Sequence, residues 1–388
     1  MKKNIVTIEN LKAVNEVLMR LNHMRRWTDM MSDPRFNELA KQALNWIITY
    51  FLSCYYEQEN GALNWERFPK IALHRSFQKA FVNYNTPENI IDEILALSDE
   101  TGLDRKMFRL LTSNKIAEET TSEFSQFLTE GLGSMELELF QNASKIATLI
   151  ELDSNIEKMG HELYAKKRSQ ILEEIDFKLP GVKAFLDEEE GEPTKLYKVV
   201  KEISCLRNQN RWAAHAYVVD CSVLGHLFDT AIFAWLMSLE ENPENEHLAS
   251  KMFFMGIFHD VAETWTTDIP SDIKDRISGF RELTERYEEK MLEKHFFNRL
   301  PEVLKQPLHA VMFEEPQNKC YFKLVKGADY LSADAECFRQ YHAGTRDDYF
   351  LGAIERRLPG IEEGKVLLTP ECAKLFKYYK EYASCCVM

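Results

Sequence analysis

The segment GHLFDTAIFAWLM, residues 225–237, indicates the fold class of this chain. Its apolar residues recur at spacings of three and four, the period of an α-helix with a buried face. The same spacing appears in NELAKQALNWIITYFL at 37–52, NIIDEILAL at 89–97 and KLFKYYKEYA at 374–383, and no long alternating stretch occurs. The sequence therefore predicts an all-α protein that is helical nearly throughout.

Length and charge limit the number of domains and the class of partner. The chain has 388 residues, of which 45% are apolar, and this is more than one hydrophobic core usually serves. The formal net charge of -14, with no basic stretch, disfavours nucleic acid as a partner. A small phosphorylated molecule remains compatible, because a metal ion and one or two basic groups can reverse the potential within a pocket.

Cysteine spacing and apolar runs indicate the compartment. The eight cysteines include no CxxC pair, and we expect them to be reduced thiols. The first residues, MKKNIVTIENLKAVNE, have no apolar core of a signal peptide, and the longest apolar runs, 231–237 and 252–258, are too short to span a bilayer. We therefore expect a cytoplasmic protein without a membrane partner.

An internal repeat organises the chain. At an offset of 185 positions, LNHMRRW at 21–27 aligns with LRNQNRW at 206–212, and LFQNASKIA at 139–147 aligns with LVKGADYLS at 324–332. Identical rare residues at one offset exceed what shared helical periodicity explains. We expect two tandem helical domains, 1–204 and 205–388, that pack as a pseudo-dimer within one chain.

The segment KMFFMGIFHDVAETWTTDIPSDIK, residues 251–274, is the sharpest chemical signal. It is an apolar helical run that ends in the pair His259-Asp260, with Glu263 four residues after the histidine. Residues four apart share one helix face, so His259 and Glu263 can address one pocket. Near a helix end, the adjacent imidazole and carboxylate can converge on one ion.

Two further polar residues lie within apolar helical patterns. His226 lies in GHLFDTAIFAWLM and Asp329 in LVKGADYLSAD, where a buried carboxylate is costly unless it has a partner such as a metal. With His259 and Asp260 they form a set of two nitrogen and two oxygen ligands. This set suits one divalent ion with open positions, such as manganese, cobalt, iron or magnesium, with zinc and nickel as alternatives.

These residues, together with Arg211-Trp212 and Asp268, resemble in order and spacing the HD superfamily of metal-dependent phosphohydrolases, and in particular its YfbR-type 5'-deoxynucleotidase branch. The resemblance covers about 206 to 345. It implies two tandem HD-like domains, of which the second is catalytic, and a phosphorylated substrate, most simply a nucleotide. The residues that it implies are the metal ligands His226, His259, Asp260 and Asp329, the catalytic residues Glu263 and Asp268, and the substrate-binding residues Arg211, Trp212, Asp268, Ser271 and Lys274.

The first repeat lacks most of this set. At the offset of 185, Lys41 replaces His226, Arg75 replaces Asp260 and Ser144 replaces Asp329, whereas His74 matches His259. Lysine and arginine donate hydrogen bonds and do not ligate cations, so we expect residues 1–204 to bind no catalytic metal.

The resemblance implies release of phosphate from nucleoside or deoxynucleoside 5'-monophosphates by metal-activated water. One alternative is an HD hydrolase of another nucleotide, a triphosphate, a cyclic nucleotide or an alarmone. A second is a catalytically silent sensor that binds nucleotides. The intact ligand set after residue 205 counts against the sensor.

Overall fold

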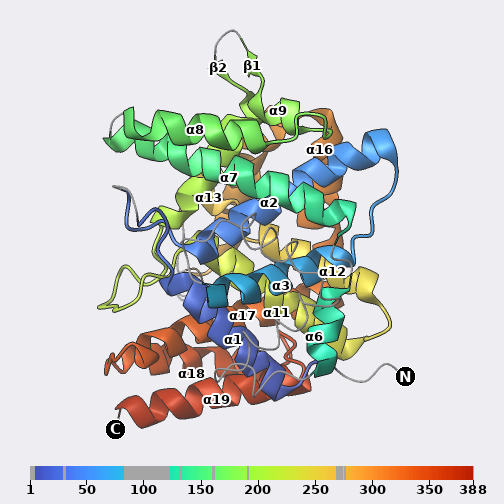
Figure 1. Ribbon diagram of the computed structural model, residues 1–388. Coiled ribbons are helices and arrows are strands. Elements are labelled where there is room, and N and C mark those ends of the chain that lie inside the picture. Colours follow the sequence, from blue (N-terminus) through green and yellow to red (C-terminus); the bar gives the residue numbers. More distant parts are fainter. Residues whose placement is uncertain are drawn as a thin grey trace.

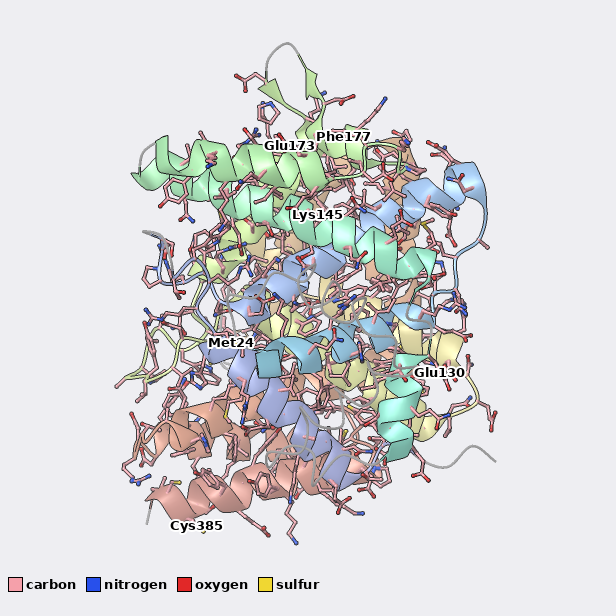
Figure 2. All side chains as sticks on the ribbon, viewed as in Figure 1. Met24, Glu130, Lys145, Glu173, Phe177 and Cys385 are labelled. Carbon is pink, nitrogen blue, oxygen red and sulfur yellow. The ribbon has the colours of Figure 1, made fainter. Side chains whose placement is uncertain are left out.

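The structure is a computed structural model that describes residues 5–28, 32–82, 122–130, 133–159, 162–189, 192–267, 274 and 277–387. Within these ranges the only named strands are two residues long each, so the prediction of an all-α protein is confirmed. Side chains fill the space between the helices (Figure 2). The segment 89–97, which we predicted to be helical, lies outside the described residues.

The elements described before residue 205 are mostly long helices. They are α1 (Ile8–His23), α2 (Glu38–Asn60), α3 (Arg67–Val82), α6 (Ser122–Thr129), α7 (Met135–Met159), α8 (Glu162–Glu174), α9 (Val182–Leu186), β1 (Glu188–Glu189), β2 (Glu192–Pro193) and α10 (Lys195–Ser204). The strands β1 and β2 pair antiparallel in the acidic segment between α9 and α10.

The elements described from residue 205 onward are again helical. They are η1 (Cys205–Asn208), α11 (Val223–Glu241), α12 (Glu246–Phe258), α13 (Glu263–Thr266), α15 (Phe280–His295), η2 (Phe297–Arg299), α16 (Glu302–His309), η3 (Ala310–Glu314), η4 (Glu315–Gln317), α17 (Lys319–His342), α18 (Tyr349–Glu362) and α19 (Pro370–Val387).

Helices α2 and α11 lie against each other at the centre of the molecule (Figure 1). Helix α7 packs on α2, and α12 and α17 pack on α11. The first helix, α1, packs on the last, α19. One continuous hydrophobic core includes Trp46 of α2 and Trp235 of α11, both buried, so the two halves of the sequence share a core.

Among the described helices, α11 alone is long and apolar enough to cross a membrane by those two criteria. Its apolar window is 94% buried inside the fold. Burial by α2, α12 and α17 accounts for its composition, because a helix that is apolar all round is typical of the core of a large protein.

The turns that lead into α2 and α11 are built alike. Asn37 caps α2 by accepting from the Ala40 N–H, and Ser222 caps α11 by accepting from the Gly225 N–H. Isolated β-bridges join Arg25 to Asn37 and Asn210 to Ser222. Both bridge residues and both caps are related by the offset of 185. This agreement supports the predicted tandem repeat, which we retain as a proposal.

A buried ion-pair network before residue 205 makes the fold sensitive to acid. Glu38 is fully buried and accepts from Arg26 Nη1 at 2.7 Å. Burial favours the neutral acid, but Arg26, Lys79 and Lys41 outweigh it and lower the pKa of Glu38 to about 2. A depressed carboxyl pKa stabilises the fold above the pKa of the unfolded chain, and this contribution is lost as the pH falls.

We therefore expect the free energy of unfolding to fall as the pH drops below about 4.5, the ordinary value for this carboxyl, toward about 2. Urea unfolding measured at pH 6, 4.5 and 3 checks this. The Glu38→Gln variant should show a shallower dependence on pH than the wild type. Equal dependence in both proteins would contradict the assignment.

Candidate metal centre

His226 lies in the first turn of α11 and is almost fully buried. Its Nε2 is 3.0 Å from Asp329 Oδ1, and its Nδ1 is 3.1 Å from Glu336 Oε1. Asp329 and Glu336 come from α17, which runs beside α11. When Nδ1 carries the proton and donates to Glu336, the lone pair of Nε2 faces Asp329, the arrangement usual for a histidine that ligates a metal.

His259 follows the last residue of α12, and a glycine determines where it lies. A Cβ added to Gly256 would come within 2.6 Å of Ala231 Cα in α11. Because any larger side chain would push the helices apart, glycine permits the close approach of α12 to α11. The rings of His259 and His226 are consequently only 5.3 Å apart between centroids.

The hydrogen bonds of His259 fit a metal ligand. Its Nδ1 lies 2.7 Å from the carbonyl oxygen of Gly256, to which a protonated Nδ1 donates. This leaves a lone pair on Nε2, which is buried, has no hydrogen-bond partner among the described residues and lies 3.1 Å from Asp260 Oδ2. A buried nitrogen lone pair beside a carboxylate suits a bound cation.

Three of the four predicted ligands meet at one point. One ligand atom from each of His226, His259 and Asp260 lies within 4.8 Å of the other two, so the three could hold a metal ion. Asp329 adjoins this group through its contact with His226. Burial opposes ionisation of Asp329, but Lys326 and His226 keep its pKa well below the usual value, so it is a carboxylate at neutral pH.

Glu336 is a functional residue that our sequence reasoning missed. It is 1% exposed, and besides its contact with His226 it accepts from Arg211 Nε at 3.1 Å and from the Trp212 indole N–H at 2.9 Å. One carboxylate therefore orients a predicted metal ligand and both residues of the predicted substrate-binding pair. Burial raises its pKa, but Arg211 and His226 outweigh burial and lower the pKa to about 2.

The same arrangement occurs at the offset of 185. Glu151 accepts from Arg26 Nε at 2.8 Å and from the Trp27 indole N–H at 3.0 Å. Its second oxygen accepts from Arg207, which belongs to η1. Comparison of Arg-Trp-Glu between the two repeats was the signal that would have revealed Glu336 from sequence.

In the first half the positions of the metal ligands hold a different contact. Lys41 Nζ donates to Ser144 Oγ at 2.9 Å, and these residues correspond to His226 and Asp329. Burial, together with the neighbouring Arg75, lowers the pKa of His74 to about 3, so the imidazole is neutral. The ammonium of Lys41 is unfavourable to a divalent cation at this position, and the absence of a catalytic metal from residues 1–204 stays a prediction.

Of the remaining predicted site residues, some lie near the predicted metal ligands, one contacts another partner, and two are not described. Arg211 Nη1 lies 3.9 Å from Asp260 Oδ2, which puts its guanidinium beside the predicted ligands. Glu263 begins α13 and is buried. Lys274 Nζ instead donates to Glu288 at 2.9 Å. Asp268 and Ser271 lie outside the described residues.

Lys326 is a second residue that sequence reasoning missed. It lies three residues before Asp329 on α17, so both side chains are on the same helix face, and its ammonium donates to Asp329 Oδ2. Burial lowers the pKa of Lys326, but Asp329 and Asp260 raise it more. The candidate centre thus contains two cationic side chains, Lys326 and Arg211, each in contact with a carboxylate.

Histidines and carboxylates from α11, from the residues after α12 and from α17 lie close together in the core of this all-α fold, as the resemblance to HD phosphohydrolases implies. The sequence profile of the family described as 5'-deoxynucleotidase YfbR-like matches residues 198–374. Over these residues the chain is a YfbR-type HD phosphohydrolase, and they include every residue of the candidate centre.

Relatives of this family are similar to part of the chain. A 5'-deoxynucleotidase of Erwinia tasmaniensis is 26% identical over 158 residues, which are 40% of this chain and 77% of the relative. A 5'-deoxynucleotidase of Photobacterium profundum is 25% identical over 139 residues, 35% of this chain and 71% of the relative. One of Photorhabdus temperata is 24% identical over 147 residues, 37% and 74% respectively.

Proposed function

We propose that this protein hydrolyses deoxynucleoside 5'-monophosphates to deoxynucleosides and inorganic phosphate. His226, His259, Asp260 and Asp329 hold one divalent cation in this proposal. The observation that carries it is the buried His259 Nε2, whose lone pair points to no hydrogen donor among the described residues and lies beside Asp260. The names of the relatives supply the substrate class.

A divalent cation held by these residues would polarise the phosphoryl group as a Lewis acid and would lower the pKa of water. Arg211 binds the phosphate in this proposal, and the hydrogen bond from its Nε to Glu336 fixes the orientation of the guanidinium. Lys326 contributes a second positive charge near Asp329. Together these groups offset the net charge of -14, which would otherwise repel a nucleotide.

Glu263 transfers the proton in the proposed reaction. Water attacks phosphorus, the bond from phosphorus to the 5'-oxygen breaks, and the proton removed from water reaches the leaving oxygen. Glu263 lies four residues after His259 and is buried at the start of α13, and in this proposal it accepts the proton from water. Trp212, held through its indole N–H by Glu336, borders the sugar site in this proposal.

Residues 1–204 serve as a structural partner in this proposal. They form a degenerate HD-like domain that packs on the second as a pseudo-dimer. The support is the shared offset of 185 in the two bridges, the two caps and the two Arg-Trp-Glu contacts.

A substrate panel tests the proposed function. The purified full chain is assayed for phosphate release from deoxynucleoside and nucleoside 5'-monophosphates, triphosphates, cyclic nucleotides and alarmones, with manganese, cobalt or magnesium added. We expect release from deoxynucleoside 5'-monophosphates at a kcat/KM at least tenfold above that for the other classes. Turnover only of triphosphates, cyclic nucleotides or alarmones would contradict the proposed substrate class. Saturable nucleotide binding without turnover would favour a sensor.

A further inference from the structure

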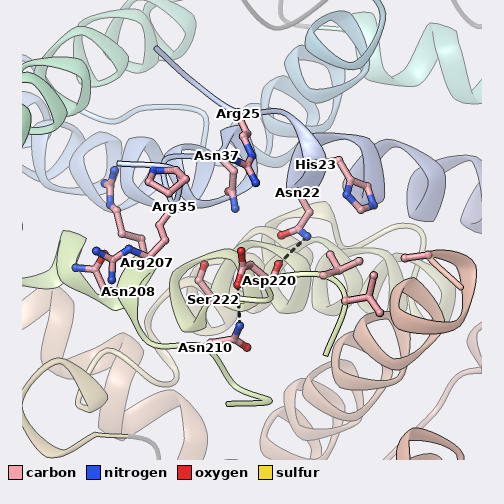
Figure 3. A pocket seen from close by; sticks show the side chains of 14 residues that line it. Asn22, His23, Arg25, Arg35, Asn37, Arg207, Asn208, Asn210, Asp220 and Ser222 are labelled. Carbon is pink, nitrogen blue, oxygen red and sulfur yellow. Dashed lines mark hydrogen bonds between the residues drawn. The ribbon is translucent and has the colours of Figure 1, made fainter. Parts of the chain in front are cut away.

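A cavity of about 280 Å³ lies between the two halves of the sequence (Figure 3). Its walls come from the end of α1 and the turn before α2 on one side, and from η1 and the turn before α11 on the other. Twelve of its fourteen lining residues form pairs at the offset of 185, among them Asn22 with Arg207, Arg25 with Asn210, and Asn37 with Ser222. The cavity therefore lies where the two repeats meet.

The lining is cationic, in contrast to the acidic chain as a whole. Arg25, Arg35 and Arg207 line the cavity, against one carboxylate, Asp220. Arg35 pairs with Asp33 at 2.6 Å, whereas the exposed Arg25 has no ion pair recorded among the described residues. Asp220 accepts from the Asn210 amide at 3.0 Å, which partly satisfies its charge. A local positive potential attracts anions that the rest of the surface repels.

Arg207 is the buried part of this lining. Its side chain is 4% exposed, Nη1 donates to Glu151 at 3.0 Å and Nε donates to the Ser204 carbonyl at 2.8 Å. Its Nη2 is buried and has no hydrogen-bond partner among the described residues. Burial lowers the pKa of Arg207 more than Glu151 restores it. An anion nearby would compensate a cation that the protein leaves incompletely paired.

Amide groups complete the lining. Asn22 donates through Nδ2 to the Asp220 carbonyl at 2.9 Å, and its buried Oδ1 has no partner among the described residues. Asn208 and Asn210 also line the cavity. Amides supply both donors and acceptors, which suit a ligand that carries polar groups besides its negative charge.

We propose that this cavity is a second binding site, distinct from the metal centre, for a small phosphorylated molecule of mononucleotide size or less. The volume sets the size limit, since it falls just below the roughly 300–1,000 Å³ typical of ligand pockets. The arginines recognise the phosphate and the asparagines the uncharged part. None of the four predicted metal ligands lines the cavity.

Calorimetric titration of the full chain tests the proposal with two probes, inorganic phosphate and deoxyadenosine 5'-monophosphate. Asp260→Ala protein with a chelator present removes metal-dependent binding and turnover. We expect one remaining site for at least one probe. Because Arg25 and Arg35 are exposed, Arg25→Ala and Arg35→Ala should fold, and each should weaken this binding by about tenfold. Lys377→Ala, which removes a charge from the exposed face of α19, is the control and should leave it unchanged.

The proposal is overturned if neither probe binds at millimolar concentration in Asp260→Ala protein with chelator, or if the two arginine variants bind as the control does. It does not depend on the proposed catalytic activity. The chain could show no turnover of any nucleotide and still bind a probe in this cavity. It could also hydrolyse deoxynucleoside 5'-monophosphates without binding either probe here.

Discussion

Asp260→Ala is expected to lower kcat for phosphate release by about 10³-fold or more, because metal-centred catalysis contributes several kcal/mol and each 1.36 kcal/mol is a factor of ten. Asp260 is one of the three residues whose ligand atoms lie close together. Its replacement by alanine also removes the carboxylate that lies beside Nε2 of His259. The measurement is phosphate release under saturating substrate, together with the metal content of the purified protein.

The matched control for this variant is Arg75→Ala, at the corresponding position in the first half. Arg75 donates to Gln78 and belongs to the half in which Lys41 contacts Ser144. We expect one divalent ion per chain in wild type and in Arg75→Ala, and less than one in Asp260→Ala. Two tightly bound catalytic ions per wild-type chain would contradict the assignment of the first half as metal-free.

Glu336→Gln is expected to lower activity by roughly 10- to 100-fold, the usual effect of losing the residue that orients a metal ligand. The amide preserves the shape of the side chain but removes the charge that holds Arg211 and His226. Removing one member of a buried ion pair also destabilises the fold by about 3 kcal/mol. Metal content should fall in parallel with activity, since His226 loses its orientation.

Glu151→Gln separates the effect on the site from the effect on stability. Glu151 holds Arg26 and Trp27 as Glu336 holds Arg211 and Trp212, but no predicted ligand contacts it. We expect a similar loss in the free energy of urea unfolding and near wild-type activity and metal content. If Glu336→Gln and Glu151→Gln lose activity and metal equally, Glu336 stabilises the fold and does not specifically orient the metal ligand.

Helical periodicity and the His226, His259-Asp260 and Asp329 pattern could be predicted from the sequence because each residue is a polar exception in an apolar run. Glu336 was missed because it lies among other polar residues in SADAECF and is not a single polar exception in an apolar run; within the sequence, only its match to Glu151 at the offset of 185 distinguishes it. Lys326 was missed because a lysine on a helix is ordinary until its contact with Asp329 is seen.

Two features of the structure, the contact of Arg207 with Glu151 and the cavity, could not be predicted from any single segment of the sequence. The contact of Arg207 with Glu151 joins residues 56 positions apart and depends on how η1 meets α7. The cavity between the halves depends on the meeting of two turns whose sequences are ordinary. The offset of 185 brings their residues into register, but only the packed chain shows that they face one space.

The close contact between Gly256 and Ala231 determines how substitutions in the core affect the candidate metal centre. Since main chain meets main chain there, the spacing between the two imidazoles is a property of the helical scaffold and not of adjustable packing. Substitutions in the surrounding core should therefore cost stability well before they alter the geometry offered to a cation. Replacement of Gly256 itself would push α12 away from α11 and would change the distance between the two imidazoles.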